Sequence, residues 1–231
     1  MILSANRIAG RMTSTDGKDR SDPLVITPYP ELDELKRKGS ASVDLRLGTW
    51  FNTVRQSKVP ILVVEDELST AARKANLTDE QIKILEEFLP SASSPTESNL
   101  AKMHYVPFGS RFILHPGNFV LGVTLEWIRL PQDLAGYVVG KSSWGRRGLI
   151  IATAAGVHPG FTGCLTLELS NCNEIPISIK PGMRICQLFL HSVDSQLEVI
   201  NDSPHSYSRR PRLGKMELDN VAKKLAEGRT R

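Results

Sequence analysis

Residues 140–169 read GKSSWGRRGLIIATAAGVHPGFTGCLTLEL, a stretch that sets both the fold and the candidate site. It begins with a turn from Gly140 to Arg146 that combines glycines, serines and basic side chains. Glycines let backbone N–H groups approach an anion, hydroxyls donate hydrogen bonds and cations neutralise charge, so this composition is typical of a polyphosphate-binding turn. Taken alone, the same residues also fit an ordinary polar surface turn.

The end of the stretch predicts a strand that carries a single carboxylate, Glu168. Side chains alternate along a strand, so Glu168 shares a face with Thr166 and Ser170 while the neighbouring leucines point the other way. A carboxylate on such a polar face points at a cavity or at solvent. Its two interpretations are a catalytic acid and base, or a structural partner for Arg146 in an ion pair.

The sequence after residue 104 predicts a mainly β protein. Short apolar runs alternate there with turn pairs such as Pro116-Gly117 and Pro181-Gly182. Regular spacing of this kind is typical of a β-sandwich or barrel. The runs lie at residues 112–114, 119–121, 123–125 and 136–139.

For the domain organisation, we expect one β domain over residues 1–210 and a basic tail over residues 211–231. An insertion at 66–98 combines helical spacing with a flexible polar segment, and its helix is expected to begin at a cap formed by Thr78–Gln81. Residues 42–48 predict a half-buried strand, on which Asp44 and Arg46 share one face. The simplest interpretation of these two charges is a local ion pair.

The composition restricts the classes of function. The chain has 231 residues, of which 40% are hydrophobic, and a net charge of +4. Residues 202–231 hold eight basic and four acidic side chains, so the tail supplies the whole excess and a nucleic-acid polymer is not an expected partner. Neither a charged-then-apolar leader nor an apolar run of about eighteen residues is present, which predicts no membrane span.

The cysteines and histidines restrict metal and redox chemistry. Cys164, Cys172 and Cys186 lie in apolar or strand-like segments and are expected to be reduced, buried thiols of a cytoplasmic protein. The sequence has neither a CxxC pair nor an H-x-E motif. Zinc-dependent deaminase chemistry is therefore not expected, and no set of protein metal ligands is predicted.

Several motifs, in order along the chain, resemble the dCTP deaminase branch of the dCTP deaminase/dUTPase superfamily. They are ILSANRI at 2–8, SASVDLRLG at 40–48, and the runs at 108–149, 158–171 and 175–190. The resemblance implies a distorted β-barrel of jelly-roll, dUTPase-like type. It also implies a homotrimer with active sites at the subunit interfaces and a deoxynucleoside triphosphate, dCTP or dUTP, as the substrate.

The resemblance also implies roles for single residues. Glu168 falls on the catalytic general acid and base, Ser142 and Arg146 are implied to orient the attacking water, and the backbone of Ala154 to help hold it. The turn 141–146 is implied to grip the triphosphate together with Mg²⁺, which binds through phosphate oxygens. The residues implied in substrate binding are Lys141, Ser142, Ser143, Arg146, His158, Thr166, Leu167, Tyr207, Arg210 and Lys215.

Two positions depart from the family pattern. Lys141 stands where the family has arginine, which keeps the charge and loses the bidentate fork. His158 stands where the family has an aspartate, and a histidine still hydrogen-bonds a hydroxyl but supplies no fixed negative charge. This second departure bears on dUTP cleavage more than on deamination, because deamination is assigned to Glu168.

The resemblance therefore implies a hydrolase, a zinc-free dCTP deaminase that converts dCTP to dUTP and ammonia. One alternative is a bifunctional dCTP deaminase/dUTPase or a dNTP pyrophosphatase, because Gln187 resembles the dUTPase version of its motif. The other alternative is a catalytically silent nucleotide-binding homologue, which His158 favours.

Overall fold

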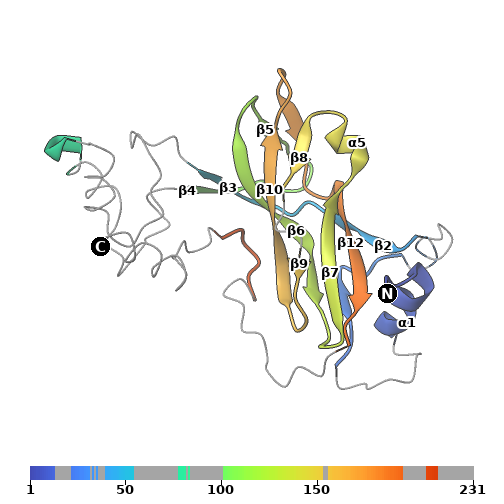
Figure 1. The fold of residues 1–231 in the computed structure, drawn as a ribbon. Helices are drawn as coiled ribbons and strands as arrows, with labels where there is room; N and C mark the ends of the chain where they lie inside the picture. Colours follow the sequence, from blue (N-terminus) through green and yellow to red (C-terminus); the bar gives the residue numbers. More distant parts are fainter. Residues whose placement is uncertain are drawn as a thin grey trace. The chain divides into compact units, whose positions relative to one another are not determined.

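Strands built from alternating apolar residues make up most of the ordered chain. The computed structural model describes residues 1–13, 22–31, 33, 35, 40–54, 78–81, 83, 101–152, 156–194 and 207–212. The chain divides into two units, residues 1–54 with 103–212 and residues 55–102 with 213–231. The elements are α1 (Ala5–Thr13), β1 (Val25–Thr27), β2 (Ser42–Arg46), β3 (Trp50–Val54), β4 (Ala101–Tyr105), β5 (Phe112–Leu114), β6 (Phe119–Arg129), β7 (Leu134–Gly140), α5 (Ser142–Gly145), β8 (Leu149–Ile151), β9 (Gly156–Val157), β10 (Thr162–Asn171), β11 (Ile177–Ile179) and β12 (Arg184–Ser192) (Figure 1).

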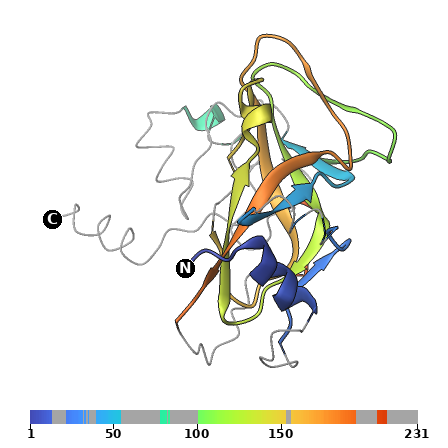
Figure 2. The ribbon, with the colours of Figure 1, turned by 90° about the vertical axis from the view of Figure 1, so that its right-hand side faces the viewer.

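Two larger sheets and one small pair carry these strands. The first sheet has the order β4-β3-β6-β10-β8, with β1 also pairing with β6, and the second has the order β2-β12-β7-β9. Strands β11 and β5 form the small pair. Apolar side chains from both larger sheets join one core, among them Leu45 and Leu188 from the second sheet and Phe51 and Leu167 from the first. The prediction of a mainly β protein is confirmed (Figure 2).

Strand β6 is longer than its sequence suggests. The apolar runs 119–121 and 123–125 form one continuous strand, because Gly122 is a packing position and not a turn. A Cβ added to Gly122 would lie 3.1 Å from Leu169 Cδ1 and 3.2 Å from Leu47 Cδ1, so a side chain there would require these two core leucines to move by a few tenths of an ångström.

An irregularity in the pairing of β6 with β10 is closed by a buried threonine. The register shifts between Cys164 and Thr166. The Thr124 hydroxyl donates to the Glu126 carbonyl at 2.9 Å and accepts from the Leu165 amide at 2.9 Å. Both backbone groups are thereby satisfied inside the core.

Strand β10 shows the predicted alternation. Leu165, Leu167 and Leu169 are buried in the core, whereas Thr166, Glu168 and Ser170 are partly exposed on the opposite face. Strand β8 pairs with the C-terminal end of β10, and the Ala152 amide donates to the Glu168 carbonyl at 2.9 Å. The backbone of Glu168 is therefore fixed while its carboxylate stays accessible.

The predicted cap in the insertion is present. The Thr78 amide donates to Gln81 Oε1 at 2.9 Å, and the Gln81 amide donates to Thr78 Oγ1 at 3.4 Å. This reciprocal pair is a capping box. The rest of the insertion at 66–98, apart from residue 83, and the tail beyond residue 212 lie outside the described residues. Within the described part of the chain, each helix is too short or too polar to span a bilayer.

Candidate active site

The basic turn connects the two larger sheets. It follows β7, and residues Ser142–Gly145 form the single helical turn α5 before β8 begins. The Lys141 carbonyl accepts from the Trp144 amide at 2.9 Å, and Trp144 Nε1 donates to the Arg184 carbonyl at 3.0 Å. The indole thus fixes the turn against the start of β12, while the side chains of Ser142, Ser143 and Arg146 are exposed.

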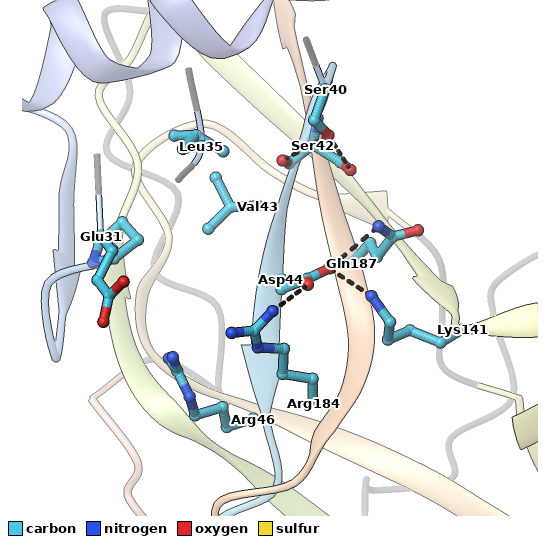
Figure 3. A pocket seen from close by; sticks show the side chains of 11 residues that line it. Glu31, Leu35, Ser40, Ser42, Val43, Asp44, Arg46, Lys141, Arg184 and Gln187 are labelled. Atoms are coloured by element: carbon cyan, nitrogen blue, oxygen red, sulfur yellow. Dashed lines mark hydrogen bonds and ion pairs between the residues drawn. The ribbon is translucent and has the colours of Figure 1, made fainter. Parts of the chain in front are cut away.

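Lys141 lies in a polar cluster on the outer face of the second sheet. The strand register places Asp44 opposite Gln187 and Gln187 opposite Val139, so Lys141, two residues after Val139, reaches the same face. Lys141 Nζ donates to Asp44 Oδ1 at 2.7 Å, and Gln187 Nε2 donates to the same oxygen at 3.0 Å. Figure 3 shows these contacts converging on the carboxylate, which Arg184 also faces at 3.7 Å.

The cluster controls the charge of its central carboxylate. Partial burial acts to raise the pKa of Asp44, but the hydrogen bonds from Lys141 and Gln187 and the charges of Lys141 and Arg184 outweigh burial. The pKa of Asp44 is therefore lowered, and the group is ionised at neutral pH.

A surface hollow opens beside this cluster. Its walls come from the second sheet and from the chain segment that precedes β2. The lining residues are Pro30, Glu31, Leu35, Ser40, Ser42, Val43, Asp44, Arg46, Lys141, Arg184 and Gln187. The wall contains three basic and two acidic side chains, a balance that suits an anionic ligand beside the ion-paired carboxylate of Asp44.

The predicted local pair between Asp44 and Arg46 is wrong, because each residue pairs with a more distant partner. The Arg46 amide donates to Glu126 Oε2 at 2.7 Å, and Arg46 Nη1 donates to Oε1 at 3.0 Å. The Glu126 side chain is 1% exposed. Burial raises the pKa of Glu126, and the two contacts with Arg46 oppose that rise without cancelling it.

Glu168 is partly exposed and lies on the face of the first sheet opposite the core leucines of β10. Leu121 of β6 pairs with Glu168 of β10 on one side and with Asn52 of β3 on the other. These three residues therefore form one row across the sheet. The Glu168 carboxylate makes no hydrogen bond or ion pair with any described residue. The alternative of a structural ion pair with Arg146 is therefore absent from the described part of the chain.

The structure places the other predicted residues in different surroundings. Thr166 lies beside Glu168 on the same face, and the exposed His158 sits in the turn before β10. Leu167 is fully buried, so only its backbone faces the polar side of β10. Tyr207 is 67% exposed, and the guanidinium of Arg210 lies 4.3 Å from the centroid of the Trp50 ring. Ala154 and Lys215 lie outside the described residues.

Two groups of predicted residues are therefore separate within one chain. The turn residues join Asp44, Arg184 and Gln187, whereas Thr166 and Glu168 face outward from the other sheet. No hydrogen bond or ion pair connects the two groups among the residues that the structure describes. Sequence reasoning missed the Asp44 cluster as a unit, although the alternating pattern at 42–48 and the motif containing Gln187 both pointed to it.

The cysteines differ in exposure. Cys164 and Cys186 are buried free thiols, as predicted, but Cys172 is exposed. The turn at residues 172–175 after β10 accounts for this difference, because it leaves the core directly after Asn171. Burial raises the pKa of Cys164 to about 11 and that of Cys186 to about 12.

Comparisons with known proteins point to one family. A family model described as dCTP deaminase-like matches residues 2–193. A protein of Dictyoglomus thermophilum named "dCTP deaminase, dUMP-forming" is 48% identical over 110 residues, which cover 47% of this chain and 56% of that protein. A protein of Methanobrevibacter smithii with the same name is 31% identical over 207 residues, which cover 87% of this chain and 91% of that protein.

One solved structure supports the fold. A 2′-deoxycytidine 5′-triphosphate deaminase from Agrobacterium tumefaciens matches with a TM-score of 0.50 and 22% identity, covering 82% of this chain and 46% of that chain. At this level of identity the likeness shows a shared fold alone.

The relatives' names correct one prediction from the sequence. The predicted enzyme was a hydrolase that converts dCTP to dUTP, with dUTP cleavage only as an added activity. That classification is wrong in its product, because the Dictyoglomus and Methanobrevibacter relatives are both named as forming dUMP.

Proposed function

Because the chain belongs to the dCTP deaminase-like family, we propose that it deaminates dCTP at C4 of cytosine and releases dUMP. The names of two relatives support this substrate and product. The observation that carries the proposal is Glu168, a partly exposed carboxylate without a described partner on a strand whose neighbouring leucines are buried. A group in that position is free to exchange protons with a bound substrate.

Glu168 serves the deamination step as a proton shuttle. It takes a proton from water as the water oxygen bonds to C4, and it passes that proton to the ring nitrogen N3. Breakage of the C4–N4 bond then releases ammonia, with Glu168 moving the proton that the leaving nitrogen needs. A second water cleaves the bond between the α- and β-phosphoryl groups, so dCTP and two waters yield dUMP, pyrophosphate and ammonia.

The basic turn supplies the triphosphate contacts. Lys141, which is ion-paired with Asp44, provides a cation, and the exposed hydroxyls of Ser142 and Ser143 provide donors. Arg146 and Ser142 are proposed to orient the attacking water and to stabilise developing charge. Mg²⁺ would bind to the phosphate oxygens of the nucleotide. It would offset the negative phosphate charge that the side chains of the turn leave uncompensated.

We propose that the complete site forms between protomers of a homotrimer. The turn and Glu168 belong to separate groups within one chain, so a turn from one protomer has to meet Glu168 of another. Exposed apolar side chains beside the turn support self-association, since Tyr137 and Val139 on β7 are 49% and 48% exposed. The free cysteines fit a reducing compartment, and we propose a cytoplasmic location.

Incubation of Glu168→Gln with dCTP and Mg²⁺ tests the proposal. Gln keeps the shape of the side chain but cannot shuttle protons, so ammonia release should fall by at least about a hundredfold while dCTP binding is retained. Glu174→Gln, the same exchange at an exposed loop position, serves as the control. Ammonia release by Glu168→Gln at a near wild-type rate would overturn the assigned role. Tight dCTP binding by the wild type without any product would identify a silent nucleotide-binding homologue.

A further inference from the structure

Strands β6 and β10, neighbours in the first sheet, do not pair in a single register (Figure 1). The pairing is regular up to Cys164 with Trp127 and resumes at Thr166 with Val123. Two steps along β10 therefore correspond to four steps along β6, and residues 124–126 of β6 form a bulge. Bulges of this kind re-aim the side chains beside them and are common next to active sites.

The hydroxyl of Thr124 takes part in the ladder at this bulge. The Leu165 amide donates to Thr124 Oγ1 at 2.9 Å, and the hydroxyl donates onward to the Glu126 carbonyl at 2.9 Å. A backbone N–H of β10 therefore reaches a backbone C=O of β6 through one side-chain oxygen. Thr124 is 1% exposed, so bulk water does not compete for these two bonds.

The segment that joins β2 to β3 holds the other edge of β6 at the same place. The Gly48 amide donates to the Val123 carbonyl at 2.7 Å, and Leu47 forms an isolated bridge with Thr124. A Cβ on Gly48 would lie 2.9 Å from the Val123 carbonyl oxygen, so a side chain there would push the segment away from β6. The backbone beside Thr124 is thereby fixed from both edges of the strand.

A buried ion pair fixes the far end of the bulge. The carboxylate of Glu126, whose carbonyl accepts from Thr124, also accepts from the Arg46 amide at 2.7 Å and from Arg46 Nη1 at 3.0 Å. Arg46 follows Asp44 by two residues on β2, and Asp44 is the centre of the polar cluster around Lys141. The bulge therefore connects the strand that carries this cluster with the strand that carries Glu168.

The bulge decides how far along β6 the carboxylate of Glu168 lies. A shift of two residues leaves every side chain on its own face, because side chains alternate with a period of two. It places Glu168 opposite Leu121, in one row with Asn52. If the register of Cys164 continued without a bulge, Glu168 would lie opposite Val123, about 7 Å away along the strand.

We propose that Thr124 is a positioning residue for Glu168. Its hydroxyl fixes the register of β10 on β6 and so sets the point at which the carboxylate meets C4 of the bound cytosine. The proposal rests on the proposed function, because it takes Glu168 as the proton shuttle. Thr124 is buried and acts through the backbone of β10, without touching the substrate. Proton transfer depends on close placement of the two groups, and a misplacement of about 1 Å costs up to about a hundredfold in rate.

Steady-state kinetics of ammonia release from dCTP with Thr124→Val and Thr124→Ser test this role. Valine keeps the branched shape and loses the hydroxyl, so kcat should fall about tenfold while KM stays within about twofold. Serine keeps the hydroxyl and loses a methyl group, so kcat should stay within about threefold of the wild type. A raised KM with unchanged kcat in Thr124→Val would contradict the proposal.

A merely structural role of Thr124 predicts a different pattern. In that case kcat would follow the loss of stability, measured by urea unfolding, equally in the valine and serine variants, and the proposal would fail. Ile8→Val serves as the control, because it removes one methyl group from the hydrophobic core at a fully buried position on α1. It should lower stability and leave both kcat and KM within about twofold of the wild type.

Hydrogen exchange tests the bridge without any activity. The Leu165 amide, which donates to Thr124, should exchange roughly tenfold faster in Thr124→Val and near the wild-type rate in Thr124→Ser. The Ala152 amide, which donates to the Glu168 carbonyl, should exchange about threefold faster in Thr124→Val, because the change reaches Glu168. Unchanged exchange at either amide would overturn the positioning role. If the wild type lacks deaminase activity, the proposed function fails while these two amides still decide whether Thr124 positions Glu168.

Thr124→Val leaves the Leu165 amide without its acceptor inside the core, which puts the fold of this variant at risk. A thermal melt shows whether the variant is folded. If it is not, Thr124→Cys compared with Thr124→Ser keeps the test, since the two side chains differ only in sulfur against oxygen and a thiol is a weak hydrogen-bonding group. The cysteine variant should then lose kcat relative to the serine variant, and equal kcat values would refute the proposal.

Discussion

Lys141 Nζ lies 2.7 Å from Asp44 Oδ1, so the first cation of the basic turn is already paired within its own chain. The pair connects β7 with β2 through the intervening strand β12. A triphosphate that binds here meets a lysine whose position is set by a carboxylate and a glutamine. The contact orients the ammonium group but also places a negative charge beside the phosphate site.

Asp44→Asn should lower stability by an amount that depends on pH. The pKa of Asp44 is lowered from 3.8, so its contribution is fully present above that value and is lost as the pH falls through the folded-state pKa. We expect a loss of about 1 kcal/mol in the free energy of unfolding at pH 7, because the pair is partly exposed. Urea unfolding at pH 7 and below pH 4 measures the difference, which should shrink in acid. A difference that grows in acid would contradict the assignment.

For Glu126→Gln, the difference in stability from the wild type should change with pH in the opposite direction. The pKa of Glu126 is raised from 4.5 by burial, so the folded state favours its protonated form and loses stability as the pH rises above that value. Because Gln does not titrate, the stability of the variant relative to the wild type should increase between pH 4.5 and pH 7. Melting temperatures of both proteins across this range provide the measurement, with Glu174→Gln as the exposed control. A difference in melting temperature between the two proteins that stays constant with pH would refute the raised pKa of Glu126.

Local patterns in the sequence were sufficient for the parts of the fold that depend on neighbours along the chain. Alternation placed Leu167 and Glu168 on opposite faces of β10, and the capping residues Thr78 and Gln81 bond as predicted. The apolar runs 119–121 and 123–125 are separated in the sequence by Gly122, but this glycine lies inside β6 and packs against Leu169 and Leu47. A sequence alone does not show which glycines face a core. The family pattern proposes roles for the candidate site residues through several ordered motifs, and those roles stay predictions.

Partners that are distant in sequence could not be predicted from local patterns. Arg46 lies two residues from Asp44, yet it pairs with Glu126, eighty positions away. The register between strands decides such pairings, and register depends on the whole sheet. The stacking of Arg209 and Arg210 on Trp127 and Trp50 also depends on the path of the chain after β12, which composition alone does not specify.

Lys141→Gln should weaken substrate binding while Lys141→Arg should preserve it. A charge-assisted hydrogen bond to phosphate is lost with Gln, so we expect KM for dCTP to rise about tenfold. Arginine restores the fork of the family pattern and has donors for both Asp44 and the phosphate, so KM should stay within about threefold of the wild type. Initial-rate measurements with Lys180→Gln as an exposed control give the comparison. An equal rise in both variants would show that Lys141 acts through packing and not through charge.

His158→Asp should separate the two reactions of the proposed cycle. The exposed His158 begins the turn before β10, where its carbonyl accepts from the Phe161 amide at 3.2 Å, and its side chain makes no hydrogen bond with a described residue. An aspartate there removes no side-chain hydrogen bond to that part of the chain. A carboxylate would accept a proton from the attacking water and orient it more strongly than an imidazole, and pyrophosphate release should rise about tenfold. Ammonia release should change by less than about twofold, because Glu168 carries that step in our mechanism. Parallel assays of ammonia and pyrophosphate from dCTP, with His158→Asn as the uncharged control, decide the matter. An equal rise of both products would mean that position 158 serves substrate binding and not cleavage of the triphosphate.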